Sequence, residues 1–224
     1  MKFLSENRAN NWLGSASTFS DEEINILFKT LTKSGKRDVF YDLGSGDGYI
    51  VRKAITVGKV KKANGIEKDM KRFIQAVEEI RDEKEASKIE MWRTDFMRFN
   101  FSDATIVLNV LAEARDEVSM YNKLFRNKKV KIVKIDLPLV GYKPVKVTRK
   151  SKESWMYLMQ TPLKNYRVKT KDEWARFVLG GKNKKIDHVY NYFDKLLKKR
   201  DFNQKDRNQF LKGLKILVNK RLAD

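Results

Sequence analysis

The sequence predicts an α/β fold whose core is an open, mostly parallel β-sheet. Short apolar segments typical of buried strands alternate with longer segments in which apolar residues recur at helical spacing. A glycine-rich turn joins the first strand to the helix that follows it. Acidic residues stand at several strand ends, and open α/β sheets bind ligands outside the carboxyl ends of their strands. These observations indicate a ligand site at that edge of the sheet.

The first strand and its turn read VFYDLGSGDG over residues 39–48. Glycine at such a turn permits positive φ angles and close approach of a ligand to the backbone. The spacing G-x-G-x-G differs from the G-x-G-x-x-G of loops that seat a pyrophosphate, and the carboxylate of Asp42 would repel that group. An acid there suits a ligand that carries an amine. S-adenosylmethionine has an amino-acid end, a ribose and an adenine but no phosphate, so the turn indicates a methyl-donor site.

Polar residues at the next three strand ends agree with this interpretation. Glu67 ends the second strand, 19 residues after Gly48, where a carboxylate is placed to accept hydrogen bonds from both ribose hydroxyls. Asp95 and Phe96 follow the third strand, where an acid would bind the adenine amino group and an aromatic ring would stack on the base. Asn109 ends the fourth strand at the same edge, where it would orient the acceptor or close the cofactor pocket.

Periodicity and capping residues give the expected elements. Ser20 and Glu23 have the spacing of a capping box before a helix that runs to about residue 31. Further helices are expected from 49 to about 57, over 73–80 and over 116–125. Strands are expected at 39–43, 63–66, 89–94, 103–109, 130–135, 145–148 and 155–158, with residues 167–168 extending the sheet.

Residues 41–54, together with Gly65, Ile66 and Glu67, resemble the class I, seven-β-strand S-adenosylmethionine-dependent methyltransferases. Residues 137–145 and 155–158 are similar to the archaeal protein-lysine methyltransferases and their mitochondrial relatives, and the resemblance covers about residues 18–160. The chain departs from that family at residues 17–20, where a Thr-Pro before the first helix is frequent. The resemblance implies a Rossmann-like sheet of order 3-2-1-4-5-7-6 with strand 7 antiparallel, S-adenosylmethionine as cofactor, S-adenosylhomocysteine as product and a protein lysine as methyl acceptor.

The candidate site residues form two sets. We expect the cofactor to contact Asp42, Gly44, Ser45, Gly46, Gly48, Glu67, Asp95, Phe96 and Asn109. Aromatic rings that line an acceptor channel stabilise cationic groups, and Trp12, Tyr142, Trp155 and Tyr157 are candidates for that channel. Asn109, Trp155 and Tyr157 form the candidate catalytic set. No metal is expected, because the sulfonium already activates the methyl group and a lysine loses its proton to solvent before attack.

Charge and periodicity divide the chain unevenly. Residues 1–127 hold 22 basic and 20 acidic residues, whereas residues 128–224 hold 27 and 9, out of totals of 49 and 29. We expect an N-terminal loop or lid at 1–19, a cofactor-binding domain at 20–170 and a basic helical extension at 171–224. Apolar stripes beginning at Ile186 and at Phe210 predict two amphipathic helices there, and Gly180-Gly181 separates them from a preceding helix. Such an excess of basic residues is typical of a solvated surface or of a face that meets nucleic acid or an acidic protein.

Composition excludes several other kinds of site. The chain has no cysteine, which excludes disulfides, thiolate metal sites and cysteine nucleophiles. A single histidine, His188, argues against a histidine metal site or a serine–histidine triad. No run of 18 apolar residues and no signal-peptide pattern is present, so we expect a soluble, cytoplasmic protein without membrane contact. The sequence indicates no oligomeric state.

Two alternatives to protein-lysine methylation stay open. An RNA methyltransferase that binds RNA through residues 128–224 would explain the basic half, although residues 109–112 read NVLA rather than the Asn/Asp-Pro-Pro-Tyr/Phe of amino-directed base methyltransferases. Ribose and other RNA methyltransferases need no such motif. A non-catalytic binding module with the same fold is the second alternative, and the acids and glycines at the strand ends argue against it.

Overall fold

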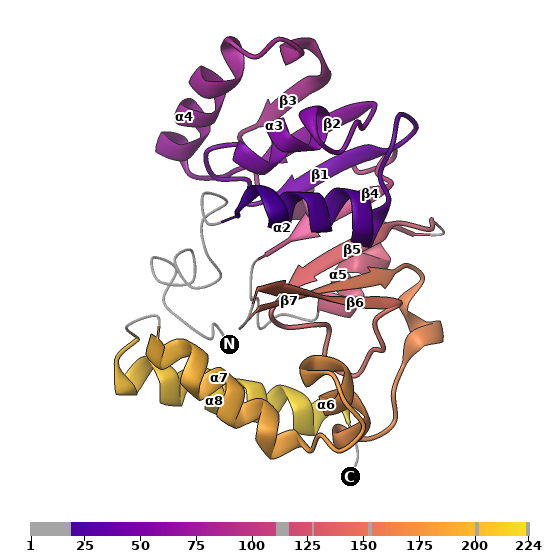
Figure 1. Ribbon diagram of the computed structural model, residues 1–224, viewed down its shortest axis with the longest axis vertical. Coiled ribbons are helices and arrows are strands. Elements are labelled where there is room, and N and C mark those ends of the chain that lie inside the picture. Colours follow the sequence, from indigo (N-terminus) through magenta and orange to yellow (C-terminus); the bar gives the residue numbers. More distant parts are fainter. Residues whose placement is uncertain (1–18, 111–116, 127, 152–153, 200–201, 223–224) are drawn as a thin grey trace.

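A computed structural model of the chain describes residues 19–110, 117–126, 128–151, 154–199 and 202–222. These residues form a seven-stranded sheet with helices on both faces and a group of three helices beyond one end of the sheet (Figure 1). The predicted α/β class is therefore confirmed. Nearly all of the expected N-terminal loop or lid lies outside the described residues.

The sheet has the order β3-β2-β1-β4-β5-β7-β6. The strands β1 to β5 pair in parallel, and β7 is antiparallel to both of its neighbours, β5 and β6, as the resemblance implied. Their bounds are β1 Val39–Leu43, β2 Lys62–Ile66, β3 Ile89–Trp92, β4 Ile106–Asn109, β5 Lys131–Ile135, β6 Lys146–Ser151 and β7 Ser154–Gln160.

The register brings the predicted strand ends to one edge. Leu43 at the end of β1 pairs with Ile66 of β2 on one side and with Asn109 of β4 on the other. Ile66 in turn pairs with Trp92 at the end of β3. The carboxyl ends of four strands are therefore level, and the loops that follow them project from the same edge of the sheet.

One face of the sheet is covered by helices α2 (Asp21–Asn25), η2 (Ile26–Thr32), α3 (Tyr49–Thr56) and α4 (Met70–Arg81). The predicted capping box is confirmed, since Ser20 Oγ accepts from the Glu23 N–H at 3.2 Å and Glu23 Oε2 accepts from the Ser20 N–H at 2.8 Å. The helix continues beyond Asn25 as expected, but in π-helical form. In its last turn the Thr32 hydroxyl donates to the Leu27 carbonyl, 2.8 Å away.

The other face is covered by α5 (Glu117–Leu124), which lies behind the sheet in Figure 1. Tyr121 and Phe125 are buried under α5. Phe125 packs against Phe101, which precedes β4, and their ring centroids are 5.4 Å apart. At the start of α5, Glu117 pairs with Lys134 of β5 at 2.5 Å, and the Lys134 side chain is only 3% exposed. A buried ion pair thus joins α5 to the sheet.

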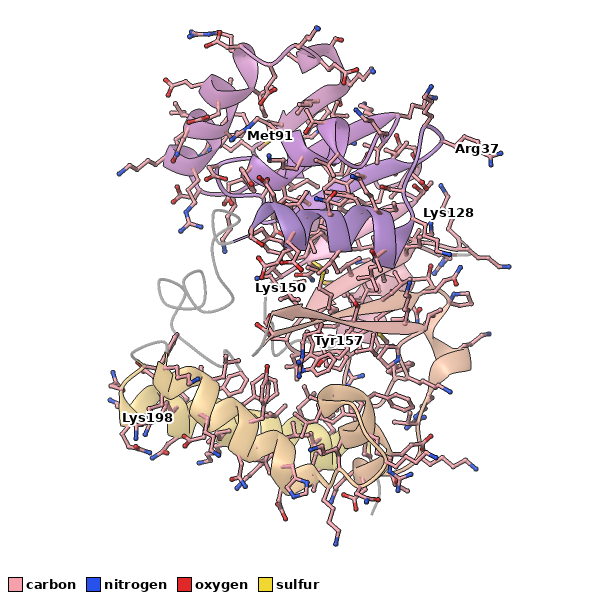
Figure 2. All side chains as sticks on the ribbon, viewed as in Figure 1. Arg37, Met91, Lys128, Lys150, Tyr157 and Lys198 are labelled. Atoms are coloured by element: carbon pink, nitrogen blue, oxygen red, sulfur yellow. The ribbon has the colours of Figure 1, made fainter. Side chains whose placement is uncertain are left out.

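Three C-terminal helices, α6 (Lys171–Leu179), α7 (Ile186–Lys199) and α8 (Gln204–Arg221), pack beyond β6 and β7. The predicted apolar stripes are confirmed as their packing faces, and Val140 and Val168 share this core. The Tyr157 hydroxyl of β7 donates to the Val178 carbonyl at 2.6 Å, and Tyr157 lies between the sheet and the helices (Figure 2). The Trp174 indole N–H of α6 donates to the Leu139 carbonyl at 3.0 Å. The helices are therefore fixed to the edge of the sheet.

Three further sequence-based expectations differ from the structure. The third strand ends at Trp92 rather than at Thr94. The fourth strand begins at Ile106 rather than at Asp103, because Ala104 N–H turns back to the Phe101 carbonyl and Asp103 accepts from the Tyr41 hydroxyl. Residues 167–168 do not extend the sheet, since Arg167 makes a single antiparallel bridge to Tyr142, outside the strands.

Packing between η2 and α3 leaves no room for a side chain at Gly58. A Cβ at this position would lie 2.6 Å from the Ala54 carbonyl oxygen and 2.8 Å from Phe28 Cδ1. We expect Gly58→Ala to lower the free energy of unfolding in urea by about 1–3 kcal/mol, the usual cost of overpacking. Gly35→Ala is the control, because a Cβ there meets no atom within 4 Å. Equal stability of the two variants would contradict this packing argument.

Candidate functional site

The glycine loop at the end of β1 is a tight turn that folds back over β2. Gly44, Gly46 and Gly48 all have positive φ angles, of 80°, 56° and 72°. The N–H groups of Gly44 and Ser45 donate to the carbonyl of Ile66, at 2.8 and 3.1 Å. Because non-glycine residues rarely adopt these angles, the alternation of glycines predicted this turn.

The carboxylate of Glu67 holds the loop from the adjacent strand end. Its Oε2 accepts from the N–H of Gly46 at 2.9 Å, and its Oε1 accepts from the N–H of Asp69 at 2.8 Å. Glu67 is only 6% exposed. A carboxylate oxygen can accept two hydrogen bonds, so acceptor capacity remains on both oxygens of Glu67 for a ligand with two hydroxyl donors.

Asp42 lies under the loop with 2% of its surface exposed. Burial, together with the nearby carboxylates of Glu67 and Asp47, raises the pKa of its carboxyl to about 8. A carboxyl in such surroundings favours the protonated form at neutral pH until a cation approaches. The position therefore favours a ligand that brings a positive charge.

The loop also presents open space and an unsatisfied polar atom. A Cβ built on Gly46 would meet no described atom within 4 Å, so the backbone of this residue faces space that no described residue fills. Ser45 is fully buried, and its hydroxyl has no hydrogen-bond partner among the described residues. A buried hydroxyl without a partner is costly, which makes it a candidate contact for a ligand.

Asp95 and Phe96 follow β3 on the far side of Glu67. The N–H of Glu67 donates to the carbonyl of Trp92 at 3.0 Å, which keeps the two strand ends together. Asp95 accepts from the N–H of Met97 at 2.9 Å and begins the short helix η4 (Phe96–Arg98). Asp95 is exposed and Phe96 is partly buried. Both residues are thus available on the loop beside Glu67.

Asn109 lies at the expected edge, but its side chain is used by the fold. Its amide Nδ2 donates to the Tyr121 hydroxyl of α5 at 2.6 Å, and only 1% of Asn109 is exposed. This geometry favours a role in fixing α5 against β4.

The end of β5 and the start of β7 continue the same edge. Asp136 has a φ of 61°, and its carboxylate accepts from Ser154 Oγ at 2.6 Å and from the Trp155 N–H at 3.3 Å. Trp155 is partly exposed, and the guanidinium carbon of Arg149 lies 5.2 Å from the centroid of its ring. Trp155 is therefore an aromatic side chain held at the carboxyl edge of the sheet.

The other aromatic candidates lie elsewhere. Tyr157 is fully buried, its hydroxyl is bonded to α6, and burial raises the pKa of this hydroxyl well above its ordinary value. This placement favours a structural role rather than a place in a channel. Tyr142 lies beside Arg167, in a groove next to α5, and Trp12 lies outside the described residues.

The sequence interpretation missed Asp136. The rule that selected Asp42, Glu67 and Asp95, an acid at the end of a parallel strand, would have selected it after β5 as well. No group of three or more histidine or acidic side chains suited to hold a metal ion occurs in the described part of the chain. No helix there is long and apolar enough to cross a membrane.

Comparisons with known proteins place this geometry among methyltransferases. No family model matches the sequence. A protein-lysine N-methyltransferase of Saccharolobus islandicus (strain REY15A) is 28% identical over 121 residues, which cover 53% of this chain and 74% of the relative. An RNA methyltransferase from Salinibacter ruber, solved in complex with S-adenosylhomocysteine, is 25% identical with a TM-score of 0.56, over 64% of this chain and 92% of that one.

A third similarity concerns the fold alone. TrmK of M. capricolum, solved with S-adenosylhomocysteine, superposes over 90% of this chain and 96% of its own with a TM-score of 0.56, at 11% identity. Strand order, the antiparallel β7 and these neighbours agree. The chain has the seven-stranded fold of the class I S-adenosylmethionine-dependent methyltransferases.

Proposed function

We propose that this protein binds S-adenosylmethionine at the carboxyl edge of its sheet and methylates lysine side chains of proteins. The observation that carries the first part is the glycine loop fixed by Glu67, with open space at Gly46. The second part is supported by the similarity to a protein-lysine N-methyltransferase. The fold alone is compatible with several acceptors.

The residues at the edge fit the parts of the cofactor. The remaining acceptor capacity of Glu67 suits the two ribose hydroxyls, and the loop of Asp95 and Phe96 beside it suits the adenine. Asp42 suits the amino-acid end, because an ammonium group supplies the charge that lets this buried carboxyl ionise. Ser45 offers a buried hydroxyl to the same ligand.

S-adenosylmethionine would supply a methyl group on a positively charged sulfur. The lysine amine would attack the methyl carbon in line with the carbon–sulfur bond, which breaks so that S-adenosylhomocysteine leaves. The protein's task is to orient the acceptor and to exclude water from the reacting atoms. Trp155 provides an aromatic surface at the same edge, suited to an alkylammonium through cation–π contact. The lysine releases its proton to solvent, so the proposal requires no histidine.

RNA is the second candidate acceptor. The RNA methyltransferase of Salinibacter ruber is 25% identical to this chain, and residues 128–224 carry 27 basic against 9 acidic residues. Both observations favour RNA as a ligand. The absence of an Asn/Asp-Pro-Pro-Tyr/Phe motif after β4 argues against amino-directed base methylation but not against other RNA chemistry.

Removing the Glu67 carboxylate should abolish the ribose contact and release the glycine loop. We expect Glu67→Ala to raise the Kd for S-adenosylhomocysteine, measured by calorimetry, at least about tenfold, since a hydrogen bond to a charged group contributes about 1.5–3 kcal/mol. Glu90→Ala is the matched control. Glu90 lies on β3, and its carboxylate pairs with the ammonium group of Lys62 on β2, 2.8 Å away, instead of with the glycine loop. Unchanged affinity in Glu67→Ala, or no binding by the wild type, would contradict the site.

The raised pKa of Asp42 predicts a specific dependence of stability on pH. Between about pH 4 and pH 8 the unfolded chain has lost this proton while the folded chain keeps it, so the free energy of unfolding falls as pH rises. Asp42→Asn removes the ionisable carboxyl, and with it this decrease in the free energy of unfolding. We expect the variant to gain stability relative to wild type between pH 5 and pH 8 in urea unfolding, whereas exposed Asp82→Asn should follow wild type. Parallel pH profiles for wild type and Asp42→Asn would refute the assignment.

The acceptor can be identified by methyl transfer from tritiated donor to a cell extract. We expect the label in protease-sensitive, nuclease-resistant material, and as methyl-lysine after acid hydrolysis. The Glu67→Ala enzyme serves as the background control. Label in nuclease-sensitive material would show that the acceptor is RNA and that the lysine proposal is wrong.

A further inference from the structure

A groove of about 650 Å³ lies outside the proposed cofactor site. It runs along α5 and is closed on its other side by residues that follow β5, by Arg167 and by the last turn of α8. Its lining residues are Val118, Ser119, Asn122, Lys123, Arg126, Val140, Gly141, Tyr142, Arg167 and Arg221. The groove thus lies between α5 and the C-terminal end of α8.

The lining is strongly cationic. Lys123, Arg126, Arg167 and Arg221 come from three separate parts of the chain, and none of the lining residues is acidic. Lys123, Arg126 and Arg167 are exposed. Like charges gathered around one concave surface raise its potential and attract anions. Ser119, Asn122 and Tyr142 add hydrogen-bonding groups beside the charges.

The fold holds the walls of this groove in place. The N–H of Val168 donates to the carbonyl of Gly141 at 2.8 Å, and Tyr142 bridges to Arg167. Gly141 has a φ of 83°, and a Cβ there would lie 3.3 Å from Leu222 Cδ2, just beyond α8. Close packing therefore fixes the backbone at Arg167 and at the end of α8 against the loop that follows β5.

We propose that this groove binds the phosphodiester backbone of a nucleic acid. Arginine supplies three of the four cations, and its planar fork pairs with phosphate oxygens bidentately. A volume of about 650 Å³ matches a drug-sized ligand and exceeds a single phosphate. Four cations from three segments around a groove of this size suit a chain of several phosphates better than a single small anion.

The groove begins close to the edge that carries the cofactor site. α5 connects the carboxyl end of β4 to the amino end of β5, so its first turn, with Val118 and Ser119, lies nearest that edge. A strand bound along α5 would thus approach the site of methyl transfer. Nucleic acid bound along α5 is compatible with a protein acceptor and with an RNA acceptor, because its binding does not depend on which group is methylated.

The test measures binding of a fluorescent 20-nucleotide RNA and a 20-base-pair DNA by anisotropy at several salt concentrations, without cofactor. We expect the double variant Arg126→Gln/Arg167→Gln to raise the Kd for nucleic acid at least tenfold. The slope of log K against log salt should become shallower by about 1.4 for single-stranded RNA, because two phosphate contacts are lost. The matched control is Lys61→Gln/Lys84→Gln, which removes two exposed charges near β2 and β3. It should stay within twofold of wild type.

Three results would overturn the proposal. Equal losses in the two double variants would show that only net charge matters. Competition by poly-glutamate as strong as that by RNA would indicate an acidic protein as the partner. Binding of inorganic phosphate in the groove, with no measurable binding of nucleic acid, would indicate a site for a small anion. None of these results affects the proposed methyl transfer, and equal urea midpoints for both variants exclude misfolding.

Discussion

The hydrogen bonds of the Glu67 carboxylate are the constraint on which the candidate site depends. They join the glycine loop after β1 to the end of β2. The same carboxylate is the acceptor that we propose for the ribose hydroxyls of the cofactor. Asp42, on β1 just before the same loop, is 2% exposed. The fold thus places two carboxylates at one buried edge, a costly arrangement that a cationic ligand would relieve.

The C-terminal helices belong to the same structure rather than to a separable appendage. Tyr157 and Trp174 tie them to β7 and to the loop after β5, and Val140 and Val168 lie within their core. Removing α7 and α8 would expose that core, so deletion would not isolate the effect of their charge. Single charge changes on exposed residues are therefore the sharper way to examine the basic half.

Local sequence signals predicted the parts of the fold that local physics determines. The turn at 44–48 was predictable because three positive φ angles require glycine, and the capping box at Ser20 because its spacing is fixed. Strand order was available only through the resemblance, since pairing between distant strands leaves no local pattern. The π-helical form of η2 was not predictable, because its apolar residues fit an ordinary helix equally well over so short a segment.

The candidate site residues show the same difference between what local sequence determines and what tertiary packing determines. Asp42 and Glu67 were selected by position at strand ends, and the register brings those ends together. Asn109 was selected by the same criterion and Tyr157 as an aromatic residue, yet α5 and α6 use their polar groups. Whether a side chain faces a ligand or a neighbouring helix depends on tertiary packing. Residue type and position at a strand end therefore predict proximity to the edge of the sheet but not the direction of the side chain.

Charge gives the proposed function a physical difficulty that the groove resolves. The chain carries a formal net charge of +20, and a protein rich in acceptor lysines would be repelled by it. At physiological ionic strength, screening acts over about 8 Å and does not remove repulsion at contact. A nucleic acid held along α5 would attract both proteins and would bring a bound basic substrate to the edge where α5 begins. The groove would then contribute to methylation by concentrating the acceptor, and its effect should disappear for a substrate that does not bind nucleic acid.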